Sequence, residues 1–177
     1  HTFEIKKFLG KKDYSEISEF ITDNIPLRGL DELVVAFECL VTENDKKSNG
    51  VVYTPPEIRR YISKETIKTE HIPHVIDPAC GCGAFLISAT QLLHEKYDTS
   101  YKEIYENFIW GCDIDSHSID KCRILLELLA FQKEGKACKY KYNLIVGNAL
   151  EILSQEKYSG KYDVVIGNPP YVRSKNI

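Results

Sequence analysis

The sequence predicts an α/β protein built on an open, mostly parallel sheet with helices on both faces. Four short apolar stretches alternate with helical patterns over most of the 177 residues. Polar or small residues follow each stretch at once, and the carboxyl ends of parallel strands are where such sheets bind ligands. Residues 1–47 show only helical patterns, so we expect a helical N-terminal segment, 1–47, ahead of a sheet-forming unit, 48–177.

The composition is that of a globular protein without a membrane-embedded part. Hydrophobic residues make up 43% and charged residues 28% of the chain, which are ordinary values. No apolar run approaches the ~18 residues of a membrane span, and early lysines interrupt any signal-peptide pattern. The six cysteines form no CxxC pair. We therefore expect neither zinc nor a disulfide framework, and a cytoplasmic location.

The net charge of −3 gives no support to nucleic-acid binding. A protein that holds a duplex through its phosphates is usually basic over that face. If DNA or RNA is the substrate, we expect most of the binding to come from a part of the protein outside this chain.

The first third of the chain predicts scaffold helices and then a segment near a ligand. Apolar residues at helical spacing predict helices over 13–24 and 31–42, and the polar stretch 44–50 indicates a loop. Thr54 and Glu57 form a capping-box pattern with Pro55 near the first helical position, which predicts a helix to about Ser63. The loop before it is placed to cover a ligand bound at the sheet.

The first predicted strand, Val75–Pro78, runs into a glycine-rich turn and a helix over 84–97. Gly81 and Gly83 let the backbone pass close to a ligand. A dinucleotide site would want GxGxxG, but Leu86 occupies the third glycine position. An acid followed by a small-residue turn favours a nucleoside-type ligand instead, with a structural turn as the alternative.

The next two strands also end in polar residues. A short helix over 100–107 precedes a strand over 108–112, which ends at Asp113. An acid at the end of the second strand can accept hydrogen bonds from both ribose hydroxyls. Ser116 is the expected cap of a long helix that ends at Gly135. The third strand, 142–146, ends near Asn148, which could pair with an adenine edge or simply form a turn.

The fourth strand carries the most specific motif. Asp163–Ile166 is a β-branched apolar run that suits a strand buried on both faces, and Asn168-Pro169-Pro170-Tyr171 follows it after a glycine. Two prolines make a rigid turn. The amide oxygen and a backbone carbonyl can accept both hydrogens of an exocyclic amine while the base stacks on the tyrosine. A bare Pro-Pro would favour a simple connector, whereas Asn-Pro-Pro-Tyr after a strand is much more specific.

In these motifs the chain resembles the amino-terminal half of a gamma-type, adenine-specific DNA methyltransferase of a bacterial restriction–modification system. The matching segments, in the family's order, are 50–58, 77–85, 111–115, 147–150 and 168–171. The resemblance implies a Rossmann-like, S-adenosylmethionine-dependent methyltransferase fold. It also implies that further strands and a target-recognition region lie beyond this chain, which would then not methylate DNA by itself.

The resemblance implies S-adenosylmethionine as the cofactor, held by residues from each strand end. The segment that covers the cofactor matches Tyr53, Thr54 and Pro55, and the turn under its methionine part matches Asp77, Ala79, Cys80 and Gly81. The acid that binds the ribose matches Asp113. The contacts with the adenine match Ile114, Asn148 and Ala149. Asn148 stands where the family usually has Asp, and its amide oxygen can still accept a bond from the adenine amine.

The resemblance also implies the reaction. The target adenine would be flipped out of the duplex and stacked on Tyr171, with its amine held by Asn168 Oδ1 and the Pro169 carbonyl. Double-stranded DNA is the implied partner, together with a specificity or restriction subunit. The alternatives are methyl transfer to RNA or to a protein glutamine through the same turn, and a non-catalytic assembly subunit that keeps the fold.

Overall fold

The structure is a computed structural model that describes residues 29–39, 54–135 and 139–171. Four parallel strands form one sheet in the order β3-β2-β1-β4. They are β1 (Val75–Asp77), β2 (Ile109–Asp113), β3 (Asn143–Val146) and β4 (Val164–Val165). The predicted α/β fold with an open parallel sheet is confirmed.

The direction of strand addition reverses next to β1. Val75 of β1 pairs with Ile109 of β2 on one side and with Val164 of β4 on the other. Chain connections leave the sheet in opposite directions on the two sides of such a point, and this opens a crevice above the carboxyl ends of the strands. The site residues predicted at the ends of β1 and β4 therefore lie side by side.

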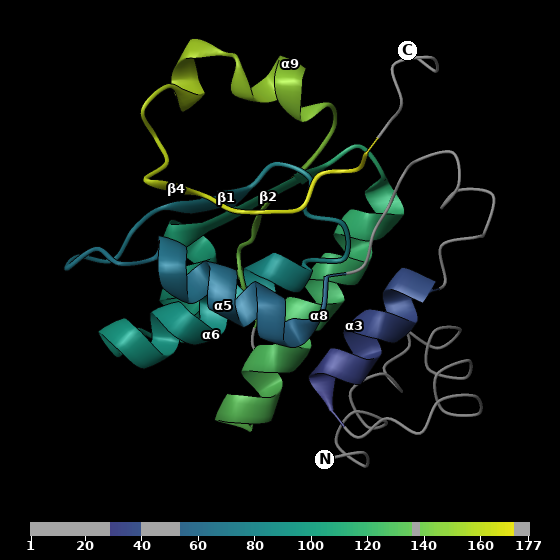
Figure 1. Ribbon diagram of the computed structural model, residues 1–177, viewed down its shortest axis with the longest axis vertical. Coiled ribbons are helices and arrows are strands. Elements are labelled where there is room, and N and C mark those ends of the chain that lie inside the picture. The colour runs from purple at the N-terminus through teal and green to yellow at the C-terminus, as the bar shows by residue number, and fades with distance from the viewer. Residues whose placement is uncertain (1–28, 40–53, 136–138, 172–177) are drawn as a thin grey trace.

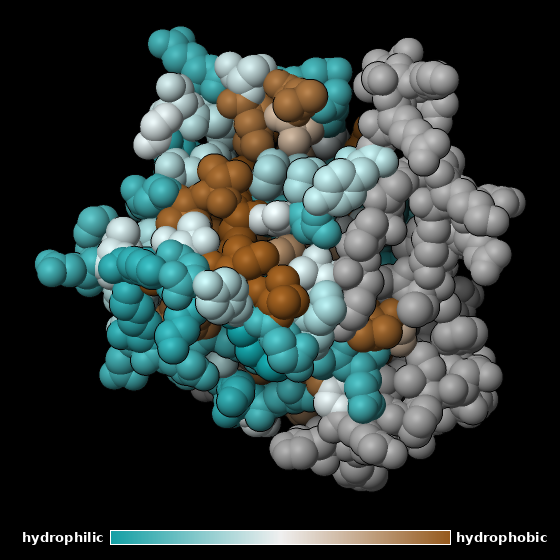
Figure 2. Space-filling model, in the orientation of Figure 1, coloured by the Kyte–Doolittle hydropathy of each residue, from teal (hydrophilic) through white to brown (hydrophobic). Residues whose placement is uncertain are grey.

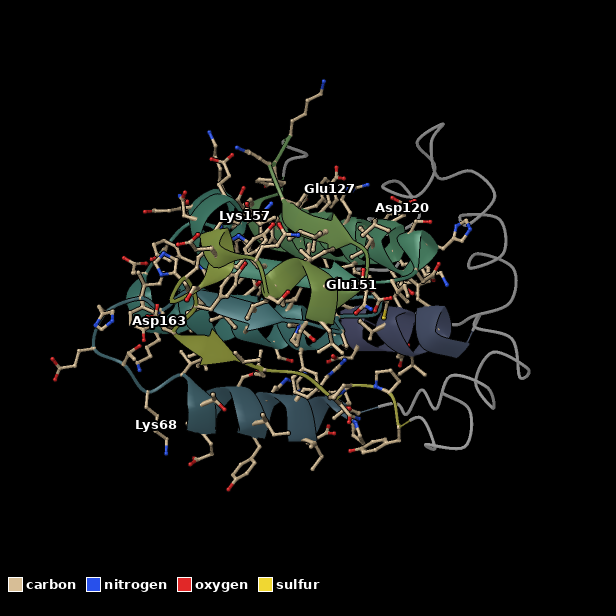
Figure 3. The ribbon with its side chains drawn as sticks, turned by 90° about the horizontal axis from the view of Figure 1, so that it is seen from above. Lys68, Asp120, Glu127, Glu151, Lys157 and Asp163 are labelled. Carbon is tan, nitrogen blue, oxygen red and sulfur yellow. The ribbon has the colours of Figure 1, made fainter. Side chains whose placement is uncertain are left out.

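Helices cover the two faces unequally (Figure 1). One face packs against α6 (Ala84–Tyr97) and α8 (Ser116–Glu134), and α5 (Pro56–Thr66) packs against α6. Helix α3 (Leu30–Cys39) packs against α8. The short helix α9 (Ala149–Leu153) and the 3-10 turn η3 (Glu156–Tyr158) lie over the other face, where Figure 3 labels Glu151 and Lys157. Before β2, α7 (Tyr101–Glu103) continues into a π-helical turn, η2 (Ile104–Phe108).

The core joins α3 to the sheet through α8 and α6. Leu33, Val34 and Phe37 of α3 are buried in the same cluster as the apolar side chains of α6, α8 and the strands. Gly111 in β2 allows α6 and β3 to come close, since a Cβ there would lie 2.8 Å from both Leu86 Cδ1 and Leu144 Cδ2. Among the described residues, no helix is long and apolar enough to cross a membrane.

Two predicted helix caps are wrong. The capping box of Thr54 and Glu57 does not form, because α5 starts one residue later, with Pro55 as N-cap and no side-chain cap. The N-cap of α8 is Asp115 rather than Ser116, and its carboxylate accepts hydrogen bonds from the His117 and Ser118 N–H groups. Aspartate and serine cap helices about equally well, and the charge of Asp115 also interacts favourably with the helix dipole.

Several predicted boundaries also shift. Helix α5 runs to Thr66 rather than to about Ser63, and the π-helical turn η2 follows from no pattern in the sequence. Strand β4 is not buried on both faces: Val164 is buried, but Val165 is 64% exposed. Figure 2 shows hydrophobic side chains gathered along β4 and towards α9. The helix predicted over 13–24 and the loop over 44–50 lie outside the described residues.

Candidate functional site

The turn after β1 is held against the end of β2 by backbone hydrogen bonds. The Cys80 N–H donates to the Cys112 carbonyl over 2.9 Å, and the Gly81 N–H donates to Asp113 Oδ2 over 2.8 Å. Gly81 and Gly83 have positive φ angles of 54° and 87°, which favour glycine. A Cβ on Gly81 would meet nothing within 4 Å, so the backbone at Gly81 borders open space.

Asp113 ties three turns together at the end of β2. Besides the Gly81 N–H, its carboxylate accepts the Asp115 N–H over 2.9 Å. Its backbone carbonyl accepts the Gly147 N–H over 2.8 Å. A carboxylate has about four acceptor positions, so these two bonds leave capacity for the ribose hydroxyls that the sequence predicts as ligands.

Asp77 is a buried acid between the ends of β1 and β4. It is 2% exposed, and its Oδ1 accepts the Ala79 N–H over 3.0 Å. Burial, and to a smaller extent the charge of Asp113, raise its pKa to about 7 against the opposing effect of the Ala79 hydrogen bond. A Cβ on Gly167 would lie 2.5 Å from Asp77 Oδ1, so the acid packs directly against the residue that precedes Asn168.

The Asn-Pro-Pro-Tyr turn lies beside the segment predicted to cover the ligand. Asn168 Nδ2 donates to Thr54 Oγ1 over 3.1 Å, across 114 residues of sequence. Asn168 is half-buried, whereas Pro169, Pro170 and Tyr171 are exposed, and the Tyr171 ring is 71% accessible. An exposed ring beside a partly buried amide can stack a base and bind its amine. Tyr53 lies outside the described residues.

The remaining predicted ligand contacts line the β2 and β3 ends. Ile114 is 76% exposed, an apolar side chain directly after Asp113. Asn148 is the N-cap of α9: its Oδ1 accepts the Leu150 N–H over 3.1 Å, and its Nδ2 donates to Glu151 Oε1 over 3.1 Å. The turn role of Asn148 is therefore present, and its predicted contact with adenine remains a prediction. Ala149 begins α9 and is half-buried.

The structure brings the described candidates to one edge of the sheet and adds two residues that sequence reasoning missed. Gly167 makes room for Asp77, and Asp115 caps α8 while its N–H fixes Asp113. A glycine at the end of a strand is a sequence signal for the close approach of another group, so Gly167 could have been found. No pattern separates Asp115 from Ser116 as the cap.

Together the fold and the site define an α/β protein whose candidate ligand-binding residues lie at the carboxyl edge of a parallel sheet. The chain belongs to the N-6 DNA Methylase family, whose family model matches residues 30–176.

The similar proteins include restriction–modification enzymes. The chain is 30% identical over 135 residues to the type II restriction enzyme and methyltransferase RM.BcgI of Heyndrickxia coagulans, a match that covers 75% of this chain and 20% of that protein. It is 26% identical over 175 residues to the type II methyltransferase M.VspI of Vibrio sp. (strain 343), covering 94% of this chain and 36% of that one. The chain thus spans between a fifth and about a third of the length of these relatives.

Solved structures share the fold. A cryo-EM structure of the DrdV–DNA complex matches with a TM-score of 0.63 and 19% identity, over 91% of this chain and 19% of that one. The type IIL restriction–modification enzyme MmeI in complex with DNA matches with a TM-score of 0.58 and 15% identity, over 92% of this chain and 28% of that one. At this level of sequence identity, the similarity shows that the fold is shared.

Proposed function

We propose that the protein to which this chain belongs transfers a methyl group from S-adenosylmethionine to the 6-amino group of a flipped-out adenine in DNA, within a restriction–modification system. The observation that carries the proposal is the contact between Asn168 Nδ2 and Thr54 Oγ1, at 3.1 Å. It joins the Asn-Pro-Pro-Tyr turn to the segment expected to cover the cofactor. The ends of β1, β2 and β3 lie on the same edge of the sheet.

The chemistry of the donor set fits S-adenosylmethionine. The Asp113 carboxylate suits the ribose hydroxyls, the exposed Ile114 offers an apolar surface to the adenine ring, and the open space at Gly81 leaves room for the methionine part. Ala79 and Cys80 belong to the same turn, and Thr54 and Pro55 directly precede α5. When bound, the cofactor supplies an electrophilic methyl group on its sulfonium.

The amine of adenine is a poor nucleophile because its lone pair is delocalised into the ring. In our proposal Asn168 Oδ1 and the Pro169 carbonyl each accept one amine hydrogen, which favours a pyramidal nitrogen and directs its lone pair at the methyl group. Pro170 keeps the turn rigid, and Tyr171 stacks on the flipped base. Because Asn168 donates through Nδ2 to Thr54, its Oδ1 is the atom directed away from Thr54.

The net charge of −3 means that other parts of the protein must supply most of the contacts to the DNA phosphates. We therefore assign sequence recognition to regions outside this chain, or to a specificity or restriction subunit. We propose that the protein acts in the cytoplasm, where bacterial DNA is found.

The test uses the full-length parent protein with radiolabelled S-adenosylmethionine and unmethylated bacterial DNA. We expect label in N6-methyladenine, and a loss of at least about 10²–10³-fold in Asn168→Ala, the usual effect of removing a group that stabilises developing charge. Lys157→Ala, an exposed residue of η3, is the control and should keep the wild-type rate. No label on DNA despite cofactor binding would contradict the proposal and redirect the search to RNA or protein glutamine.

A further inference from the structure

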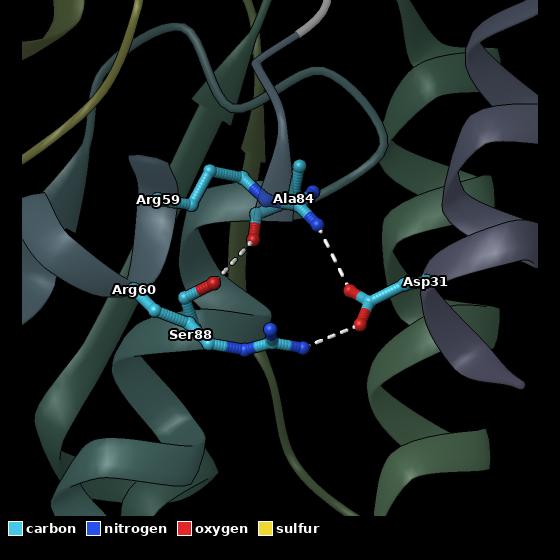
Figure 4. A network of polar contacts seen from close by, with 5 residues as sticks. All are labelled: Asp31, Arg59, Arg60, Ala84 and Ser88. Carbon is cyan, nitrogen blue, oxygen red and sulfur yellow. Dashed lines mark hydrogen bonds and ion pairs between the residues drawn. The ribbon is translucent and has the colours of Figure 1, made fainter. Parts of the chain in front are cut away.

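One carboxylate of α3 holds two neighbouring arginines of α5 (Figure 4). Asp31 Oδ1 lies 3.0 Å from Arg59 Nη2, and Asp31 Oδ2 pairs with Arg60 Nη2. The Arg59 side chain is 0% exposed, whereas that of Arg60 is 51% exposed. An exposed pair is screened by water and contributes little, but a buried arginine depends strongly on its partner. The interaction that matters is therefore the one between Asp31 and Arg59.

Among the described residues, Arg59 has little else to compensate its buried charge. Its Nε and Nη1 atoms are buried without a hydrogen-bond partner in the structure, and among the described residues Asp31 is the acid that pairs with it. A guanidinium carries five N–H donors and does not lose its proton in proteins. If Asp31 is removed, the buried guanidinium loses the acid that pairs with it among the described residues, and this favours a shift of Arg59 and of α5 towards new partners.

A short series of hydrogen bonds and chain connections leads from Arg59 to the candidate catalytic amide. The Arg59 backbone N–H donates to the Pro55 carbonyl over 3.1 Å. Pro55 follows Thr54, whose hydroxyl accepts Asn168 Nδ2 over 3.1 Å. No side chain caps this end of α5. The contact with Asp31 is thus a side-chain anchor of the first turn of α5, which follows Thr54.

We propose that Asp31 is a positioning residue for methyl transfer: through Arg59 it fixes the start of α5, and thereby sets where Thr54 holds the Asn168 amide. The inference rests on the proposed function, because it assigns the catalytic amide to Asn168. It gives α3, which packs on α8 outside the sheet, a part in the reaction. A displacement of the amide by about 1 Å is enough to slow a reaction that depends on a near-attack geometry.

The first test measures single-turnover methylation in the full-length parent protein, with cofactor and DNA saturating. The rate constant of a single turnover does not depend on the fraction of protein that is folded, so it separates positioning from stability. We expect Asp31→Ala to lower this rate constant about 10-fold or more, and Asp31→Glu to restore most of it. Asp120→Ala is the matched control, because it breaks the exposed pair with Arg123 on α8, and it should keep the wild-type rate constant.

A double-mutant cycle with Thr54→Val identifies the route. If Asp31 acts through Thr54, removing the hydroxyl abolishes most of the effect of Asp31→Ala, and the two losses are not additive. Additive losses, or a wild-type rate constant with a reduced amplitude in Asp31→Ala, would overturn the proposal and leave Asp31 as a stabilising residue.

A second readout needs no activity. Amide hydrogen exchange of the peptide that covers 54–66 should become faster in Asp31→Ala and remain unchanged in Asp120→Ala. Unchanged exchange in both variants would overturn the proposal whatever the substrate is. A different outcome is faster exchange in Asp31→Ala together with a wild-type protein that does not methylate DNA. This result would refute the proposed function and leave the role of Asp31 in anchoring α5 intact.

Discussion

The acidic residues at the amino ends and at the carboxyl ends of the strands make different kinds of contact. At the amino end, Asp163 Oδ2 accepts the His74 N–H over 2.8 Å and lies 3.1 Å from His74 Nδ1, with both side chains more than 40% exposed. Nearby, Lys161 Nζ lies 5.0 Å from the Trp110 ring centroid, a cation–π contact. The His74–Asp163 contact combines a backbone N–H donor with an exposed pair of side chains, and water screens that pair.

At the carboxyl end, the acids that bind backbone amides of neighbouring turns are buried or half-buried, whereas Asp163 is exposed. Asp113 accepts from Gly81 and Asp115, and the buried Asp77 accepts from Ala79. A carboxylate held by backbone donors is fixed in place, and a change there moves a turn rather than a single side chain. The comparison teaches that the sheet tolerates substitution at its amino end and depends on individual atoms at its carboxyl end.

The largest expected effect is on pH dependence, at Asp77. Its pKa is raised from 3.8 to about 7, so between these pH values the unfolded chain ionises the group while the native protein keeps it protonated. The contribution of Asp77 to the free energy of unfolding is therefore fully present below about pH 4 and is lost as the pH rises to about 7. The loss is roughly 4 kcal/mol, at about 1.36 kcal/mol per pH unit. Asp77→Asn should remove most of this slope.

Thermal unfolding of the parent protein at about pH 4 and about pH 8 checks this. We expect Asp77→Asn to raise the melting temperature at the higher pH and to leave it almost unchanged at the lower one. An equal shift at both pH values would show that Asp77 is ionised in the native protein.

Gly167→Ala should affect activity next most strongly. Its Cβ would lie 2.5 Å from Asp77 Oδ1, so either the acid or the turn that carries Asn168 must move. We expect methyl transfer to fall about 100-fold, together with a loss of about 1–3 kcal/mol of stability from overpacking. Gly29→Ala is the matched control, since a Cβ there meets nothing within 4 Å. Wild-type activity in Gly167→Ala would show that this contact does not position Asn168.

Asp113→Ala should weaken cofactor binding by about 10- to 100-fold, because hydrogen bonds to a charged group contribute about 1.5–3 kcal/mol. The substitution also releases the Gly81 and Asp115 N–H groups that the carboxylate holds. Isothermal titration with S-adenosylmethionine measures the change. Asp115→Ala serves for comparison: it removes the α8 cap at a cost of about 1 kcal/mol, and should leave the affinity near that of the wild type.

The smallest effect is expected at the amino end. The hydrogen bonds and charge interaction with His74 lower the pKa of Asp163, so its contribution is present above pH 3.8 and is lost as pH falls below that value. Because the pair is exposed, Asp163→Ala should cost no more than about 0.5–1 kcal/mol of stability near neutral pH, measured by urea unfolding. A loss as large as that expected at the carboxyl end would remove the contrast between the two ends.

The sequence was sufficient to predict the sheet and the edge on which the candidate residues lie. Alternation of apolar strands with helical patterns predicts both, since parallel strands end on the same side. The contact between Thr54 and Asn168 could not be predicted, because it joins residues 114 positions apart. The same contact explains the wrong cap at α5: the Thr54 hydroxyl accepts the Asn168 amide, and the helix starts at Pro56.

Burial was harder to predict than strand position. The apolar run at β4 suits a strand covered on both faces, yet Val165 is 64% exposed. The short elements α9 and η3 are the ones described over that face, and they leave Val165 exposed. The ion pair of Asp31 with Arg59 was missed for the related reason that an arginine in an amphipathic helix is usually expected at the surface.

The buried cysteines in and around the glycine-rich turn make it possible to measure how often the turn opens. Cys80, Cys82, Cys112 and Cys122 are buried thiols, and the contact with Cys122 together with burial raises the pKa of Cys80. A thiol reagent attacks only the exposed thiolate, so the native turn excludes it and labelling proceeds only through opening. The rate of alkylation at Cys80 therefore reports how often the turn separates from β2. A ligand that binds over the turn should slow this rate.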